Sequence, residues 1–530
     1  MAIKNNLRFF GKKQKNNSSQ AFYSISILFS LMYLQRVVRG ISLSFVLIIL
    51  GAFLAYVFRR TLALELSIED YGLFYSLLSF FGFFMLFVDM GIEQATTKRI
   101  VELLQQKKKE QIPSVVMTIL FGQLAVSVVF SLLFLLGTNF IAAYYFHNAH
   151  VTSFFFILIF WFLTTPLFTF CAYILLGFQR TTWYTALDAA RMLIVVLISL
   201  IGFRYDVSLY VPVIAYALIN IILFLVTYPY IISFFHEMRL FSVRIWKTIN
   251  KTEGLGILHY SIPVAFTSFG WIIITQTDTI VLTYFTSLRD VGIYNIALPI
   301  SLLLLFFMRP VIIVFAPLVT ELATAQRFEK LTEALTLAYT YLFVLLLPFA
   351  VGMALFPEYI ISLLFSEKYL AAVPALQLLS IGTLFYSFSL FNNIIYTGIG
   401  HATKIAKTVA SLCVVNFFLT ILFVGVFHWN IIGAALATTI SYILLFITST
   451  YGLAKQFSFS FPLKIWVLSI IFVSASALLL QIFKKILPWN NLAEALLCGT
   501  LFLLFYVFLL LITKTVQVQQ IKNILARAVL

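Results

Sequence analysis

Ionisable side chains inside apolar stretches of membrane-spanning length are the first candidates for chemistry in this sequence. They are Asp89, Asp188, Arg191, Asp278 and Arg309. A charge at the middle of a membrane costs about 2.5–3.5 kcal/mol on insertion scales, so such residues usually face a cavity or a partner of opposite charge. Their positions therefore indicate where the chain could bind an ion or an anionic ligand.

The arginines of these stretches and of their ends are suited to phosphate. A planar guanidinium group can give a phosphate or a pyrophosphate two parallel hydrogen bonds. We therefore predict that Arg59, Arg60, Arg191 and Arg309 bind the headgroup of an anionic substrate. Two alternatives stay open: each charge extends to its nearest membrane surface, or Arg191 forms a local ion pair with Asp188, three residues before it.

An acid and a base occupy matching positions in two of the stretches. Asp89 and Arg309 are 220 residues apart, which is the offset of the internal repeat described below. Each lies roughly 27 Å of helix from the start of its stretch, near the cytoplasmic end. We hypothesise that the two close an inner gate, and that alternating access breaks this pair while it forms an outer one.

The outer gate is expected around a third carboxylate. Asp278 maps by the same offset to the residue before Arg59 and Arg60, so these charges are candidates for an outer pair. Gln276 and Asp188 join this set of gate or coupling residues. A buried carboxylate in the set is also a candidate for carrying a coupling proton.

Fourteen transmembrane helices are predicted to hold these residues. The chain has 530 residues, of which 62% are hydrophobic and only 10% charged, and this excludes a soluble globular surface. The apolar runs are continuous, reach the length of about 20 residues that a membrane helix needs, and lack the alternation of barrel strands. The predicted spans are 40–62, 71–92, 113–137, 153–177, 183–203, 209–234, 257–286, 291–318, 333–356, 371–398, 405–427, 431–453, 463–483 and 490–513.

Basic residues set the expected orientation. The net charge is +16, from 35 basic and 19 acidic residues, and most of the basic residues fall on one side of the predicted spans. By the positive-inside rule this side is cytoplasmic, so we expect a multi-pass protein of the inner (plasma) membrane with both termini in the cytoplasm. Residues 1–39 are interpreted as a basic interfacial segment that contacts anionic headgroups, with a flexible basic tail as the alternative.

Two pairs of sequence segments indicate an internal repeat. Residues 70–74 (DYGLF) resemble 290–294 (DVGIY) at an offset of 220, and residues 177–180 (GFQR) resemble 398–401 (GIGH) at an offset of 221. The near-constant offset favours duplication of a six-helix unit, and because six is even, both copies share one orientation about an axis along the membrane normal. The expected organisation is a basic N-terminal segment at 1–39, an N-lobe at 40–234, a linker at 235–256, a C-lobe at 257–453, and two C-terminal spans with a tail at 454–530.

Short motifs in the second, seventh and eighth spans are typical of a known family. They are EDYGLF at 69–74, DMG at 89–91, KR at 98–99, YSIP at 260–263, QTD at 276–278 and GIYNIA at 292–297. In these motifs the chain resembles the polysaccharide-transporter branch of the multidrug/oligosaccharidyl-lipid/polysaccharide exporter superfamily, which includes flippases for lipid-linked O-antigen units. The resemblance implies an all-α protein with two six-helix lobes around a central cavity lined by spans 1, 2, 7 and 8. It does not extend to the basic segment before residue 36.

The resemblance also implies a function. The expected activity is translocation of a polyprenyl-diphosphate-linked oligosaccharide from the cytoplasmic to the outer leaflet by alternating access, for cell-surface polysaccharide biosynthesis. The expected partners are this lipid, membrane lipids, a polysaccharide polymerase and glycosyltransferases, but no nucleic acid. No phosphate loop, catalytic triad or metal motif is present in the sequence. We therefore expect a transporter rather than an enzyme, without a cofactor. The energy source stays open, since the membrane potential, a proton gradient and a sodium gradient all fit.

Three alternative functions stay open. A cation-coupled multidrug exporter would share the fold, although cationic drugs favour acidic cavities, whereas arginines outnumber acids among the candidates. A membrane glycosyltransferase or polymerase is the second, although such enzymes usually need a long extracytoplasmic catalytic loop or a carboxylate cluster, and the sequence has neither. A non-transporting scaffold of a polysaccharide assembly complex is the third.

Overall fold

A computed structural model describes residues 43–237, 261, 276–457, 461–486 and 492–513 of the chain. In this part of the chain the secondary structure is helical, and eleven helices are long and apolar enough to cross a membrane. The prediction of an all-α polytopic membrane protein is confirmed, while the count of fourteen spans stays a prediction. The segment 1–39, most of the linker 235–256 and the first part of the seventh span lie outside the described residues.

The helices of the first half follow the predicted spans, with one addition. The first described helix is Leu43–Glu65. It is followed by α2 Ile68–Asp89, α3 Ile92–Gln105, α4 Ile112–Tyr144, α5 Val151–Gly177, α6 Thr181–Gly202 and α7 Tyr210–Glu237. The addition is α3, an amphipathic helix in a segment that hydropathy assigns to a loop.

The second half of the chain begins with the seventh span. Residues 276–285 are helical and form the described part of the seventh span. They are followed by α9 Leu288–Ser301, α10 Met308–Thr324, α11 Phe328–Leu355, α12 Pro357–Leu364, α13 Val373–Gly398, α14 Ala402–Thr420, α15 Asn430–Phe457, α16 Leu463–Ile486 and α17 Leu492–Ile512. A 3₁₀ stretch, Leu302–Phe307, joins α9 to α10, so these two elements form one long interrupted span.

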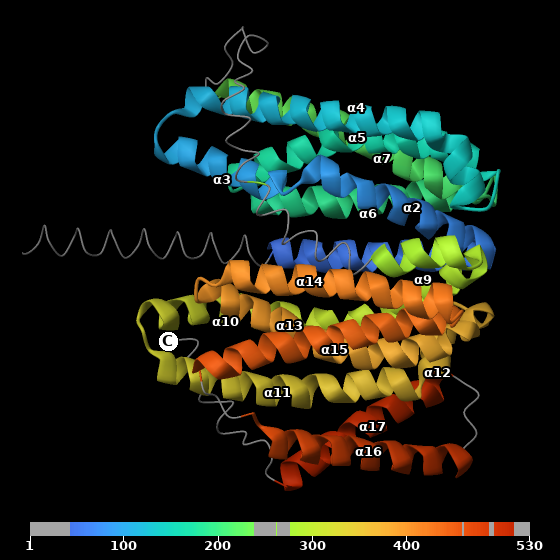
Figure 1. The fold of residues 1–530 in the computed structure, drawn as a ribbon, viewed down its shortest axis with the longest axis vertical. Helices are drawn as coiled ribbons and strands as arrows, with labels where there is room; N and C mark the ends of the chain where they lie inside the picture. Colours follow the sequence, from blue (N-terminus) through green and yellow to red (C-terminus); the bar gives the residue numbers. More distant parts are fainter. Residues whose placement is uncertain (1–42, 238–260, 262–275, 458–460, 487–491, 514–530) are drawn as a thin grey trace, which may run out of the picture.

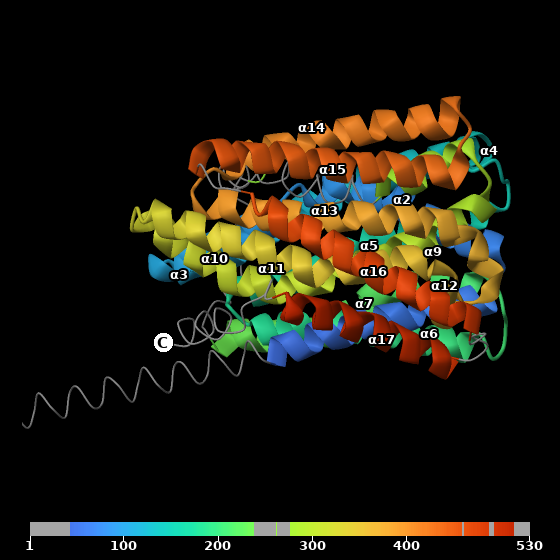
Figure 2. The same cartoon turned by 90° about the horizontal axis from the view of Figure 1, so that it is seen from below.

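Two helix bundles lie side by side along the long axis of the molecule (Figure 1). The N-lobe consists of the helix Leu43–Glu65 and α2–α7, and the C-lobe consists of residues 276–457. Helices α16 and α17 pack on the α11 side of the C-lobe. Figure 2 shows the helices running roughly parallel to one another, as in a bundle that crosses a membrane. The lobes meet through α2 and α9, which are the second helix of each repeat.

Matching caps begin α2 and α9. Ser67 Oγ accepts a 3.0 Å hydrogen bond from the backbone N–H of Asp70 and donates one of 2.8 Å to its carboxylate. Ser287 and Asp290, 220 residues later, make the same two bonds at 3.2 and 2.8 Å. Serine satisfies an unpaired N–H of the first turn, and the aspartate favours the positive end of the helix dipole. We call this end of the bundle the capped end, and the opposite end, where α3 stops and α11 starts, the basic end.

Candidate functional site

Paired glycines mark the crossing of α2 and α9. A Cβ atom added to Gly72 would lie 1.9 Å from the carbonyl oxygen of Leu288, and one added to Gly292 would lie 2.3 Å from that of Ile68. No side chain fits at these distances, so the two backbones touch directly, as small residues permit between membrane helices. Both the glycines and their contacts are related by the repeat offset of 220. The sequence shows these glycines only as matching positions of the repeat, and it does not predict that their backbones touch.

Hydrogen bonds continue this contact along one face of α2. The hydroxyls of Ser76 and Thr283 lie 2.8 Å apart, and the Ser79 hydroxyl donates to the Gln276 side-chain oxygen at 2.6 Å. Residues three and four apart share a helix face, which places Gly72, Ser76 and Ser79 in one line. Gln276, predicted as a gate or coupling residue, therefore bonds across the lobe interface.

Backbone carbonyls hold the lobes together at the capped end. The Tyr56 hydroxyl and the Arg60 Nε both donate to the carbonyl oxygen of Leu364, at 2.7 and 3.1 Å. Lys368 Nζ donates to the Leu66 carbonyl at 2.8 Å in the opposite direction across the interface. Arg60 is exposed here and its guanidinium joins the two lobes.

Arg59 lies at the interface without a carboxylate partner among the described residues. Its guanidinium carbon is 4.3 Å from the centre of the Tyr75 ring. Its Nη1 reaches the Asn295 carbonyl of α9 in a long hydrogen bond of 3.5 Å. A cation over an aromatic face is stabilised without being neutralised. The fork of Arg59 thus keeps hydrogen-bonding capacity for an anion.

Arg191 and Arg309 have different surroundings. Arg191 forms an ion pair with Asp188 at 2.8 Å on α6, which is the local pair that their spacing allows. Its Nε is buried and has no hydrogen-bond partner. Arg309 is exposed at the start of α10, with its guanidinium carbon 5.2 Å from the ring centre of Phe306.

Asp89 does not face Arg309 in this structure. Its carboxylate accepts a 2.6 Å hydrogen bond from the Tyr173 hydroxyl and further bonds from the backbone N–H groups of Gly91 and Glu93. Met90 and Gly91 both have positive φ, so the chain turns sharply after Asp89 and starts α3. The carboxylate thus caps α3 and ties it to α5, and the hypothesised inner pair is not formed in this conformation.

Asp278 lies inside the C-lobe and not beside Arg59 or Arg60. It is fully buried and accepts hydrogen bonds from Tyr294 of α9, from Thr420 of α14 at 3.2 Å and from Thr438 of α15 at 2.5 Å. The hypothesised outer pair is therefore also not formed. The carboxylate instead joins three helices of one lobe.

The neighbours of Asp278 supply further oxygens. The Asn416 amide donates to Thr438 Oγ1 at 3.2 Å, while its own Oδ1 is buried and has no hydrogen-bond partner. No basic group is among the charges acting on Asp278 within the described residues. A buried carboxylate surrounded by neutral oxygens is stabilised by a proton or by one monovalent cation. We call Asp278, Tyr294, Asn416, Thr420 and Thr438 the Asp278 cluster.

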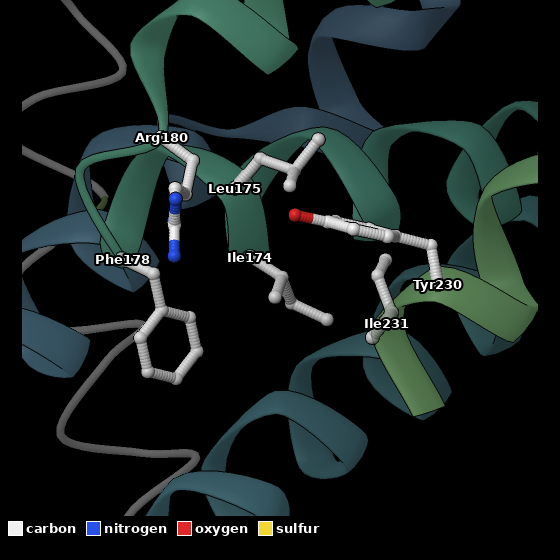
Figure 3. Close-up of a pocket in the computed structure, with 6 residues that line it drawn as sticks. All are labelled: Ile174, Leu175, Phe178, Arg180, Tyr230 and Ile231. Carbon is white, nitrogen blue, oxygen red and sulfur yellow. The ribbon is translucent and has the colours of Figure 1, made fainter. Parts of the chain in front are cut away.

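A small pocket lies elsewhere, in the N-lobe (Figure 3). Its walls are the end of α5, the turn that follows it and one face of α7, and they are apolar except for Arg180 and Tyr230. None of the predicted site residues lines it. We therefore place the candidate site at the lobe interface and in the Asp278 cluster.

Family comparisons cover most of the chain. The model of the family described as "Polysaccharide biosynthesis protein" matches residues 37–323, and that of the MatE family matches residues 263–426. An uncharacterized membrane protein of Methanocaldococcus jannaschii is 28% identical over 518 residues, which cover 94% of this chain and 99% of that protein.

Solved transporters are similar in fold. The lipid II flippase MurJ in an inward closed conformation has a TM-score of 0.70 at 17% identity, covering 89% of this chain and 98% of its own. A multidrug resistance MATE family transporter of the MOP superfamily, in an inward-facing conformation, has a TM-score of 0.56 at 17% identity, covering 77% and 94%. Transport proteins thus share the arrangement of the two lobes.

Proposed function

Because this chain belongs to the polysaccharide biosynthesis protein family, within the polysaccharide-transporter branch of the multidrug/oligosaccharidyl-lipid/polysaccharide exporter superfamily, we propose that it flips a polyprenyl-diphosphate-linked oligosaccharide across the membrane. Its families and structural neighbours are transporters and flippases rather than enzymes. The substrate headgroup passes between the lobes while the polyprenyl tail stays in the bilayer. The product then serves a polysaccharide polymerase and glycosyltransferases as partners.

The observation that carries this proposal is Arg59, a cation at the lobe interface that no described carboxylate neutralises. Arg59 and Arg191 both lie close enough to the Tyr216 hydroxyl of α7 to act on it electrostatically, as does Asp188, the ion-pair partner of Arg191. A diphosphate brings about two negative charges, which two such groups can bind through paired hydrogen bonds. A site that recognised cationic drugs would need the opposite charge.

The proposed orientation follows from the basic residues. Several lysines lie in the turn after α3. Arg327 lies in the turn before α11, and Lys330 lies in the first turn of α11. Both turns belong to the basic end, which we assign to the cytoplasmic side of the inner membrane by the positive-inside rule. The substrate then enters from the basic end, and the capped end faces outward.

The Asp278 cluster is the proposed coupling site. One carboxylate, two threonine hydroxyls and a free amide oxygen suit Na⁺, with a proton on Asp278 as the competing occupant. Divalent ions favour sites with more carboxylates, and no group of three or more His, Cys, Asp or Glu side chains that could hold a metal occurs in the described part of the chain. Gradient-driven uptake of this ion would power the cycle.

Substitution of Asp278→Asn is expected to uncouple flipping from the ion gradient. An amide keeps the shape but loses the charge that a cation requires. In proteoliposomes, an imposed Na⁺ gradient should accelerate flipping by the native protein and not by the variant. An imposed pH gradient tests in the same way whether a proton is the coupling ion. Asp206→Asn, which alters an exposed loop carboxylate, should respond like the native protein. A variant that still follows the gradient would remove Asp278 from coupling.

Reconstitution with defined substrates tests the function itself. Proteoliposomes receive polyprenyl-diphosphate oligosaccharides in one leaflet, and an impermeant glycosidase or lectin reports those that reach the other. Flipping of at least one such lipid is expected. Failure with every lipid, combined with export of a cationic dye, would overturn the proposal in favour of a multidrug exporter, the function suggested by the MatE match over residues 263–426.

A further inference from the structure

We propose that the Gly72–Gly292 crossing is the seal of the capped end, and that Tyr294 is a positioning residue that links the Asp278 cluster to this seal. The proposal rests on the alternating-access transport proposed above. It concerns residues that make no contact with substrate. It predicts that the seal loosens when either the glycines or the Tyr294 hydrogen bond is altered.

The seal follows from how closely the two backbones approach. A Cβ on Gly72 would also lie 2.8 Å from the backbone nitrogen of Gly292, so backbone surrounds this position and no flexible side chain can yield. Any larger residue must push α9 away from α2. The adjacent Ser76 and Thr283 side chains are 0% and 1% exposed, so the contact excludes water while the glycines are in place.

The link follows from the next turn of α9. Tyr294 lies two residues after Gly292 and donates its hydroxyl hydrogen to Asp278. Its neighbour Asn295 donates to Thr279 at 3.2 Å, and the Asn295 carbonyl accepts from Arg59. One turn of helix spans 3.6 residues, so a single turn of α9 carries the crossing, the cluster contact and the Arg59 contact.

A bound cation changes what the Tyr294 hydroxyl faces. Without the cation the Tyr294 hydroxyl donates to a carboxylate oxygen of Asp278. This bond fixes α9 to the rest of the C-lobe within one turn of the Gly72–Gly292 crossing. A cation on Asp278 takes that oxygen and disfavours a hydrogen pointing toward it, so the bond is lost. The ion thereby binds the loosened state more tightly, which is the difference in affinity that a shift between two conformations requires.

A buried cysteine reports the seal without any transport assay. In a protein whose Cys171, Cys413 and Cys498 are replaced by alanine, Ser76→Cys is introduced and its reaction rate with a charged maleimide is measured in detergent. Gly72→Ala and Gly292→Ala should each raise this rate by about tenfold or more, as expected for a tenfold shift toward the open state. Gly82→Ala is the matched control on α2, because no heavy atom lies within 4 Å of a Cβ added there. Equal rates in the Gly72→Ala and Gly82→Ala proteins would overturn the seal.

A second pair of variants tests the link and spares the packing of the crossing. Tyr294→Phe removes one oxygen and with it the hydrogen bond to Asp278, so it should raise the labelling of Ser76→Cys. Tyr442→Phe is the matched control, because the Tyr442 hydroxyl is buried and has no hydrogen-bond partner. If Ser76→Cys is labelled no faster in the Tyr294→Phe protein than in the Tyr442→Phe protein, the proposed link through Tyr294 is wrong. These labelling rates are measured without substrate, so a failure of the proposed seal can be distinguished from a failure of the proposed flippase function.

Discussion

Oxidation of a Ser76→Cys/Thr283→Cys double variant is expected to stop flipping completely, and reduction is expected to restore it. The two native hydroxyl oxygens lie 2.8 Å apart across the lobe interface, so two cysteine sulfurs at these positions need only a small further approach to form the S–S bond of about 2.05 Å. Alternating access moves one lobe against the other, so a covalent bond across the capped half of α2 holds the protein in one state. Flipping is measured in proteoliposomes before oxidation, after it, and after addition of a reductant.

A matched bond within one lobe is the control for this lock. The hydroxyls of Ser44 and Thr182 lie 3.5 Å apart, but both belong to the N-lobe. Oxidation of the Ser44→Cys/Thr182→Cys variant should therefore leave flipping at its unoxidised rate. Undiminished flipping by the cross-linked Ser76→Cys/Thr283→Cys protein would show that α2 and the seventh span stay together throughout the cycle, and would refute a seal at the capped end.

Replacement of Arg59→Ala is expected to lower the flipping rate by about 100-fold. Two hydrogen bonds from a charged group to a buried phosphate contribute about 3 kcal/mol in total, and 1.4 kcal/mol corresponds to a factor of ten. Arg59→Lys keeps the charge but loses the planar fork, so an intermediate rate is expected. The rates are compared at equal amounts of reconstituted protein.

The control for Arg59 is an exposed arginine that carries the same charge. Arg289 is exposed in the first turn of α9, at the capped end. Arg289→Ala should flip at nearly the native rate, because it changes net charge equally but removes no candidate substrate contact. If Arg59→Ala and Arg289→Ala behave alike, Arg59 is not part of the headgroup site.

Long spans are predictable because hydropathy over some twenty residues depends little on local detail. The predicted spans 113–137 and 333–356 correspond to the helices Ile112–Tyr144 and Phe328–Leu355. Real helices also continue beyond the apolar core, which is why the ends differ. Hydropathy does not reveal α3, whose charged residues resemble a loop. Its buried Ile92, Ala95, Thr96, Ile100 and Leu103 recur at intervals of one to four, and this helical period was the available signal.

The candidate site is less predictable, because sequence spacing gives a residue's helix but not its neighbours from other helices. Asp278 is correctly expected within a span, but its partners Thr420 and Thr438 are 142 and 160 residues away. Asp89 lies two residues before Gly91, a turn signal that points to a helix cap rather than to a gate. The spacing of Asp188 and Arg191, in contrast, directly gives their ion pair, because both lie on one helix.

The reciprocity of the α2–α9 contact bears on how such a chain could arise. Gly72 faces the carbonyl of Leu288 while Gly292 faces that of Ile68, so each partner presents the same surface to the other. This is the isologous geometry of a twofold homodimer. Two separate copies of a six-helix unit with one capping serine and one glycine would already have had this interface. Fusion of two such genes would therefore preserve this contact and would need only a linker to join the halves.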